Sequence, residues 1–199
     1  MNKVNYDEKM KETIAALEGV PKLLLHSCCA PCSSYCITEV SPYFAVTVFY
    51  YNPNIDTDEE YEHRKMEQER FIRSVEWKNP VDFVGCDHEK PDFSAVAKGL
   101  EDVPEGGERC FACYRLRLEK TAQYAKTHGY DYFTTTLSVS PLKNAQKLNE
   151  IGYELQEKYG VRFLPADFKK RGGYLKSTEL SREYNLYRQN YCGCEFSKR

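Results

Sequence analysis

Segments typical of β-strands alternate along this chain with segments typical of α-helices, and that order limits the fold more than any other feature. Five segments are rich in β-branched, aromatic and leucine side chains, as buried strands are, and they cover residues 22–27, 43–51, 81–87, 130–141 and 161–168. Helical crossovers between successive strands make the strands parallel and cover the sheet on both faces. We therefore expect an α/β fold, a Rossmann-like three-layer sandwich with a mostly parallel sheet.

The segments between the expected strands have the spacing of amphipathic helices. Thr57 and Glu60 are spaced as a capping box at the start of one of them. Leu148, Ile151 and Leu155 share one face of another. Helices are expected over residues 56–77, 92–100, 108–129, 144–160 and 177–191.

A single domain over residues 1–199 is the simplest organisation, because the chain contains neither an internal repeat nor a low-complexity linker. It lacks a run of about 18 apolar residues, so no transmembrane helix is expected. The N-terminal segment 1–22 is charged and lacks the apolar stretch of a signal peptide. We therefore expect a cytoplasmic protein, in which nine cysteines indicate metal or redox chemistry before structural disulfides.

Polar and reactive side chains follow several of the expected strands. Ligands of open α/β sheets bind beyond the carboxyl ends of the strands. The segments at that edge would be Cys28 to Cys32, Asn52 with Asn54, Cys86 to His88, Ser138 with Ser140, and Asp167 with Lys169 to Arg171.

The cysteines fall into groups that suggest a metal site. Cys110 and Cys113 lie one turn apart at the start of an expected helix, where the helix dipole favours thiolates. Two thiols from this turn and two from the loop that holds Cys28, Cys29 and Cys32 would complete a four-thiolate site for zinc or an iron–sulfur cluster. Adjacent cysteines are unusual for zinc. For Cys36 and Cys86, packing is the favoured interpretation.

The segment "YCGCEF" near the C-terminus places Cys192 and Cys194 on either side of Gly193. A disulfide between them would close a small, strained ring, and strained, exposed disulfides are often catalytic or regulatory. The alternative is a pair of free thiols on a frayed tail. We favour a redox-active pair.

Three motifs, "HSCCAPCS", "ERCFACYRLRL" and "NYCGCEFS", occur in this order, and together they resemble the cobalamin-independent epoxyqueuosine reductase family of the QueH type. The resemblance extends over essentially the whole chain and implies one iron–sulfur reductase domain on an adenine-nucleotide-hydrolase-like scaffold. Members of this family reduce the epoxide of epoxyqueuosine, at the wobble position of certain tRNAs, to the alkene of queuosine. The resemblance thus implies an enzyme of tRNA modification that carries out the last step of queuosine biosynthesis.

The resemblance also implies roles for individual cysteines. Cys28, Cys29, Cys110 and Cys113 would ligate a [4Fe-4S] cluster, and Cys192 with Cys194 would form a redox-active disulfide. The resemblance also implies an additional iron beside the cluster. Cys32 is the candidate ligand for this iron, and its assignment is weaker than that of the four cluster cysteines. Removal of an epoxide oxygen as water requires two electrons and two protons, so an electron donor of unidentified nature is also expected. The candidate proton donors are Asp87, His88, Tyr114 and Ser138.

The expected RNA partner is the anticodon loop of a tRNA, and neither DNA nor a membrane is an expected partner. A net charge of −2 argues against a broadly basic surface but permits a local basic patch. The run Lys169 to Arg171 is one candidate for contact with the RNA backbone, and Arg115 with Arg117 is another. For both groups the alternative is an ordinary surface charge.

Two other functions are compatible with parts of the sequence. A metal-free thiol–disulfide oxidoreductase would use Cys110 with Cys113, or Cys192 with Cys194. A zinc-stabilised RNA-binding module would bind about one zinc per chain and have no redox activity. The loop "SCCAPCSS" contains no glycine, so it is not expected to bind the pyrophosphate of ATP.

Overall fold

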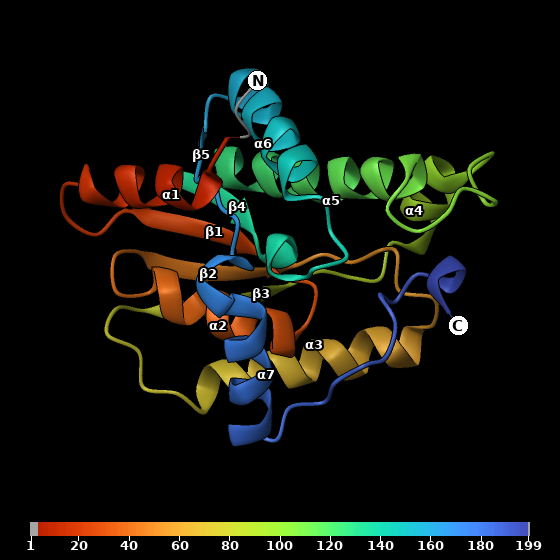
Figure 1. Ribbon diagram of the computed structural model, residues 1–199, viewed down its shortest axis with the longest axis horizontal. Helices are drawn as coiled ribbons and strands as arrows, with labels where there is room; N and C mark the ends of the chain where they lie inside the picture. Colours follow the sequence, from red (N-terminus) through yellow and green to blue (C-terminus); the bar gives the residue numbers. More distant parts are fainter. Residues whose placement is uncertain (1–3, 199) are drawn as a thin grey trace.

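The structure is a computed structural model, and it describes residues 4–198 (Figure 1). Its core is a five-stranded sheet of order β3-β2-β1-β4-β5, in which every neighbouring pair of strands is parallel. The strands are β1 (Lys22–His26), β2 (Ala45–Tyr50), β3 (Val81–Gly85), β4 (Tyr132–Thr135) and β5 (Arg162–Phe163). The parallel α/β sandwich predicted from the sequence is confirmed.

Helices cover both faces of the sheet (Figure 1). The helices are α1 (Tyr6–Ala15), α2 (Ala30–Val40), α3 (Asp58–Arg73), α4 (Lys90–Ala97), α5 (Glu108–Thr127), α6 (Ala145–Tyr159) and α7 (Gly173–Glu183), with short 3-10 turns η1 (Thr136–Val139), η2 (Lys170–Gly172) and η3 (Glu195–Ser197). Leu23 and Leu25 of β1 pack with α2 and α3, whereas Leu24 packs with α5 and α6. Side chains of one strand point alternately to the two faces, so each face has its own apolar core.

The sequence places the last helix too far along the chain. Instead of residues 177–191, α7 covers Gly173–Glu183. Asn185 has a left-handed backbone conformation (φ +48°), which ends the helix. Leu186 is then buried, and the chain runs along α3, where the backbone N–H of Tyr187 donates to Glu67 Oε1 at 2.7 Å. This turn returns the C-terminal segment to the carboxyl edge of the sheet.

Candidate active site

A trio of thiols stands at the carboxyl end of the central strand. Cys28 and Cys29 follow β1, and Cys32 lies in the first turn of α2. The three Sγ atoms lie within 4.8 Å of one another, and those of Cys28 and Cys29 are 3.8 Å apart. This grouping could hold a metal ion. The extended backbone of Cys29 (φ −175°) at the helix N-cap gives adjacent residues 28 and 29 different directions while keeping their sulfurs close.

The three thiols interact by hydrogen bonds and lie at the N-terminus of α2. Hydrogen bonds with Cys28 and Cys32 lower the pKa of the Cys29 thiol, and the hydrogen bonds with Cys28 and Cys29 raise the pKa of Cys32. The N-terminal end of α2 adds a positive potential that favours negative charge on these sulfurs. Cys29 is therefore the thiol of the trio that ionises first, and the trio is suited to bind a cation.

Buried polar contacts hold the thiol loop against α3. The Ser27 hydroxyl donates to Gln68 Oε1 at 2.6 Å, and the Ser33 hydroxyl donates to the same atom at 2.7 Å. The side-chain amide of Asn52, after β2, donates to the Ser27 carbonyl at 2.8 Å. These contacts, all in the interior, fix the loop on either side of Cys28 and Cys29. Such a supported loop presents its ligands with little freedom.

Cys110 and Cys113 lie in the first two turns of α5 and are not members of the 4.8 Å trio. The Cys110 sulfur accepts from the backbone N–H of Gly106 at 3.2 Å. Cys110 and Cys28 pack against the same buried cluster, formed by residues such as Tyr114 and Leu137. Cys110 and Cys28 thus approach the same part of the interior from two elements, whereas Cys113 packs with Phe93 and Ala97.

The C-terminal dithiol is anchored, so it does not lie on a frayed tail. The Gly193 carbonyl accepts from the backbone N–H of Asp56 at 3.0 Å. The Cys192 carbonyl accepts from Nη1 of Arg64, a fully buried side chain, at 3.3 Å. Gly193 has φ +107°, a conformation that favours glycine, so the residue between the two cysteines suits the turn.

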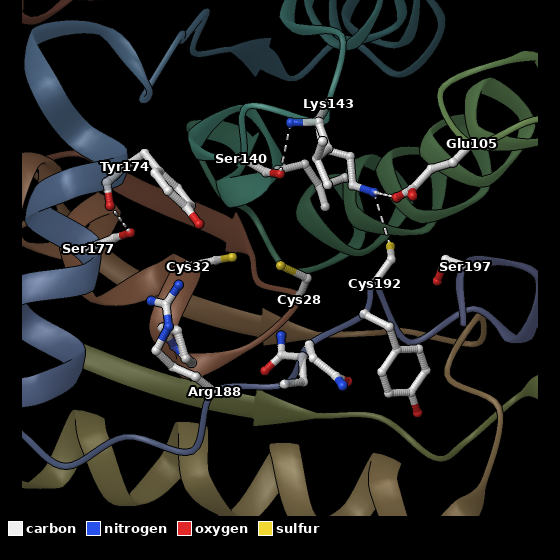
Figure 2. A pocket seen from close by; sticks show the side chains of 16 residues that line it. Cys28, Cys32, Glu105, Ser140, Lys143, Tyr174, Ser177, Arg188, Cys192 and Ser197 are labelled. Carbon is white, nitrogen blue, oxygen red and sulfur yellow. Dashed lines mark hydrogen bonds and ion pairs between the residues drawn. The ribbon is translucent and has the colours of Figure 1, made fainter. Parts of the chain in front are cut away.

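Cys28, Cys32 and Cys192 open into one cavity of about 230 Å³ (Figure 2). The cavity is also lined by side chains from the segment after β4, from α7 and from the C-terminal segment, among them Ser140, Lys143, Tyr174 and Arg188. Two thiols of the trio and Cys192 of the C-terminal dithiol therefore face the same space. The sequence predicted both groups of cysteines but not this shared cavity.

Two buried cations accompany these sulfurs. Lys143 Nζ donates to Cys192 Sγ at 3.0 Å and lies 3.8 Å from Glu105 Oε1. Burial lowers the pKa of Lys143, but the interactions with Cys192 and Tyr114 outweigh burial, so the net pKa is raised and the ammonium form is retained. Arg117 is 1% exposed, and its Nε donates to the Cys113 carbonyl at 3.2 Å. The sequence singled out neither residue for this role.

Most of the candidate proton donors lie elsewhere or are engaged. His88 contacts Asp58 Oδ1 and the Ile55 carbonyl, and the Ser138 hydroxyl accepts from the backbone N–H of Phe168. Tyr114 is different. Its hydroxyl is buried without a hydrogen-bond partner among residues 4–198, and burial raises its pKa to about 12.

The basic residues that were expected to contact RNA are largely engaged within the protein. Arg171 pairs with Asp7 and Glu39, and Arg115 pairs with Glu154. Lys169 lies 3.2 Å from Asp167. Arg117 is buried, so it is not available to a phosphate. From these two groups Lys170 alone is exposed and carries no ion pair within the described chain.

The family model described as epoxyqueuosine reductase QueH matches residues 23–199 of this chain. The chain belongs to the QueH family. A relative from Staphylococcus epidermidis, named epoxyqueuosine reductase QueH, is 44% identical, with 98% of this chain and 85% of the relative covered. Relatives of the same name from Streptococcus pyogenes and Thermotoga maritima are 40% and 38% identical, over 98% and 88% of this chain and 78% and 89% of their own lengths.

The matched region of this QueH-family chain contains all the cysteines described above, from Cys28 to Cys194. Cys36 is fully buried in the core on α2, which agrees with the packing role predicted for it. Within residues 4–198, no helix is both long enough and apolar enough to cross a membrane.

Proposed function

We propose that this chain reduces the epoxide of epoxyqueuosine in tRNA to the alkene of queuosine. The observation that carries this proposal is that one cavity, in a chain of the QueH family, is lined by Cys28 and Cys32 on one side and Cys192 on another. The reaction breaks both C–O bonds of the epoxide, forms a C=C bond and releases the oxygen as water. It consumes two electrons and two protons, and thiols and metal-bound thiolates are groups that handle both.

We further propose that Cys28, Cys29, Cys110 and Cys113 hold a [4Fe-4S] cluster and that Cys32 faces an adjacent iron. Thiolates are the ligands that such clusters use, and the trio brings together two of the four proposed cluster ligands, Cys28 and Cys29, with Cys32 beside them. The buried guanidinium of Arg117 supports the same assignment, because it is 1% exposed and its Nε donates to the carbonyl of the proposed ligand Cys113. A buried cation needs negative charge nearby, which a thiolate-bound cluster has. When bound, these groups would supply single electrons and a Lewis acid.

Cys192 and Cys194 are the proposed source of the electron pair. Oxidation of the two thiols to a disulfide releases two electrons and two protons, which equals what the epoxide consumes. The two residues have different surroundings: Cys192 lines the cavity, whereas Cys194 packs with Phe93, Ala97 and Phe196. Burial raises the pKa of Cys194, so this thiol keeps its proton at neutral pH. An external reductant must then restore the dithiol after each turnover.

Lys143 is the proposed proton-bearing group at the cavity wall. Its Nζ already donates to Cys192 Sγ, and its side chain is 7% exposed. As a C–O bond of the epoxide breaks, negative charge forms on the oxygen. An ammonium within the same cavity stabilises that charge by donating a hydrogen bond in a site from which water is largely excluded.

The test begins with protein purified and reconstituted without oxygen. We expect a brown protein with about four or five irons per chain, which converts epoxyqueuosine tRNA to queuosine tRNA in digests analysed by mass spectrometry. The double variant Cys110→Ala, Cys113→Ala is expected to lose the colour and the activity. Cys86→Ala is the matched control, because Cys86 is half-buried like Cys110 but follows β3 and is not a member of the trio.

Other outcomes would identify the competing functions. Protein that takes up no iron and leaves the epoxide intact would overturn the proposal. Stoichiometric zinc in such protein would favour an RNA-binding module, and a colourless protein that reduces protein disulfides would favour a metal-free oxidoreductase.

A further inference from the structure

Two large apolar side chains stand exposed at the mouth of the cavity. Leu142, before α6, is 59% exposed, and Tyr174, in the first turn of α7, is 45% exposed. Both line the cavity that contains Cys28, Cys32 and Cys192. Single exposed hydrophobic residues are ordinary on a protein surface, but two at the entrance of one cavity form a surface that a ligand would cover.

Tyr174 is held in place through its backbone while its ring is left without a partner. Its carbonyl accepts from the Ser177 hydroxyl at 2.7 Å. Within residues 4–198 neither the ring nor the phenol of Tyr174 makes a ring contact or hydrogen bond. By contrast, the phenol of Tyr191, which lines the same cavity, donates to Asp56 Oδ1 at 2.7 Å. Figure 2 shows the Tyr174 ring directed into the space above Cys32.

The start of α7 is closely packed, so the position of Tyr174 is rigid. A Cβ atom at Gly173 would overlap the Phe168 carbonyl oxygen and the Tyr35 ring. The helix therefore approaches these groups as closely as a glycine allows. On such a fixed turn only the side-chain torsions of the aromatic residue remain to be ordered when a flat ligand binds.

A cation accompanies the aromatic ring at the same entrance. Arg188 is exposed and lines the cavity, and its Nη1 donates to the Ser181 hydroxyl at 3.2 Å. That acceptor is neutral, so the charge of the guanidinium is available to an anion. The entrance thus combines an aromatic face, an aliphatic side chain and a positive charge, which are the features that bind unpaired nucleotides.

We propose that Tyr174 is a stacking platform for an unpaired base next to the modified nucleotide, with Leu142 bordering that base and Arg188 contacting an adjacent phosphate. This inference rests on the proposed function, because it takes the substrate to be an RNA loop. A base must leave its stack to enter the cavity, and its neighbour then loses a stacking partner. The Tyr174 ring replaces that partner.

The experiment measures binding of a fluorescein-labelled, unmodified tRNA transcript by anisotropy, together with the fluorescence of 2-aminopurine placed beside the wobble position. Tyr174→Ala is expected to weaken binding by about five- to 150-fold. It is also expected to abolish the quenching of 2-aminopurine, whereas Tyr174→Phe preserves both signals. Tyr43→Ala is the matched control: Tyr43 is 47% exposed but precedes β2, at the opposite edge of the sheet.

Salt dependence separates the aromatic contact from the charged one. Tyr174→Ala is expected to shift the affinity by the same factor at every salt concentration. Arg188→Gln is expected to reduce the slope of log affinity against log salt by about 0.7, the value for one phosphate contact on a single strand. Arg182→Gln, on the exposed side of α7, is the control and should leave the slope unchanged.

Tyr174→Ala that binds and quenches like the wild type, in protein with an unchanged melting temperature, would overturn the inference. Turnover of epoxyqueuosine tRNA is measured separately on the wild type. If the wild type binds RNA through Tyr174 but leaves the epoxide intact, the proposed function fails and the stacking contact stands. If it reduces the epoxide and Tyr174→Ala does so with the same KM, the contact fails and the function stands.

Discussion

Replacing Lys143 with Met would remove the ammonium that donates to Cys192 Sγ while leaving a side chain of similar length. Lys143 Nζ lies 3.0 Å from that sulfur, and its side chain is 7% exposed. Water therefore has little access to substitute for the missing donor. If Lys143 stabilises the charge that forms on the epoxide oxygen, the variant must slow the chemical step.

The expected size of the effect follows from the strength of a charged hydrogen bond. A hydrogen bond that involves a charged group contributes about 1.5–3 kcal/mol. At about 1.4 kcal/mol for each factor of ten, the single-turnover rate should fall about 10- to 150-fold. The fold favours the ammonium form of Lys143, whose pKa is raised, and Lys143→Met also removes the ion pair with Glu105, so the variant is expected to have a lower melting temperature than the wild type. The two rates are therefore compared at a temperature at which both proteins are fully folded, which separates the role in catalysis from a role in folding.

The assay is rapid chemical quench under single-turnover conditions, with the alkene product measured by mass spectrometry after digestion of the tRNA. Lys143→Arg should retain part of the rate because it keeps a cation at the wall. Lys147→Met is the control, because Lys147 lies in the first turn of α6 and pairs with Glu150 at 3.3 Å. A rate for Lys143→Met within about twofold of the wild type, at equal iron content, would refute the assignment.

Three further changes test other parts of the structure. Gly193→Ala places a Cβ 3.0 Å from Arg64 Nη1 at a residue whose φ is +107°, so the substitution should displace the dithiol. The single-turnover rate should fall more than about tenfold, whereas iron analysis should find an unchanged iron content. Burial raises the pKa of Cys86 to about 11, so its alkylation at pH 8 should be about 100-fold slower than that of a thiol with pKa 9. The rate, followed by peptide mass spectrometry, should rise about tenfold per pH unit up to about pH 10, and a rate independent of pH would contradict this. A Cβ at Gly152 would overlap the Phe163 ring, so Gly152→Ala should lower the free energy of unfolding in urea by about 1–3 kcal/mol, and an unchanged midpoint would mean that the ring moves aside freely.

The order of strands and helices was predictable because each strand contains a short run of apolar residues, a pattern that is typical of buried strands and not of surface segments. Leu23, Leu24 and Leu25 are all completely buried, since β1 is central and covered on both faces. The end of α7 was not predictable in the same way. The pattern of apolar residues continues through Leu186, but Leu186 joins the core only after the chain has turned at Asn185.

The thiol trio was predictable because local spacing determines it. Cys28, Cys29 and Cys32 are close in sequence, so a strand end followed by a helix turn is enough to bring their sulfurs together. Lys143 depends instead on tertiary structure, because it meets Cys192 across 49 residues of chain. A lysine between a leucine and an asparagine in a short loop has the sequence pattern of a surface residue. Assembly of the cavity from distant segments is what buries it.

Arg115 and Arg117 show how helical geometry separates residues that look equivalent in the sequence. Two positions apart on a helix, they point to opposite sides. Arg115 is 44% exposed and pairs with Glu154, whereas Arg117 is 1% exposed. Arg117 follows Cys113 by four residues, so it lies on the face of α5 that carries this thiol and donates to its carbonyl. A buried guanidinium is unfavourable unless acceptors or negative charge compensate it, and on this face its acceptor is the Cys113 carbonyl, with the thiolates of the proposed cluster as the source of negative charge. The spacing from Cys113, rather than the nearness to Arg115, was therefore the signal in the sequence that Arg117 belongs to the site.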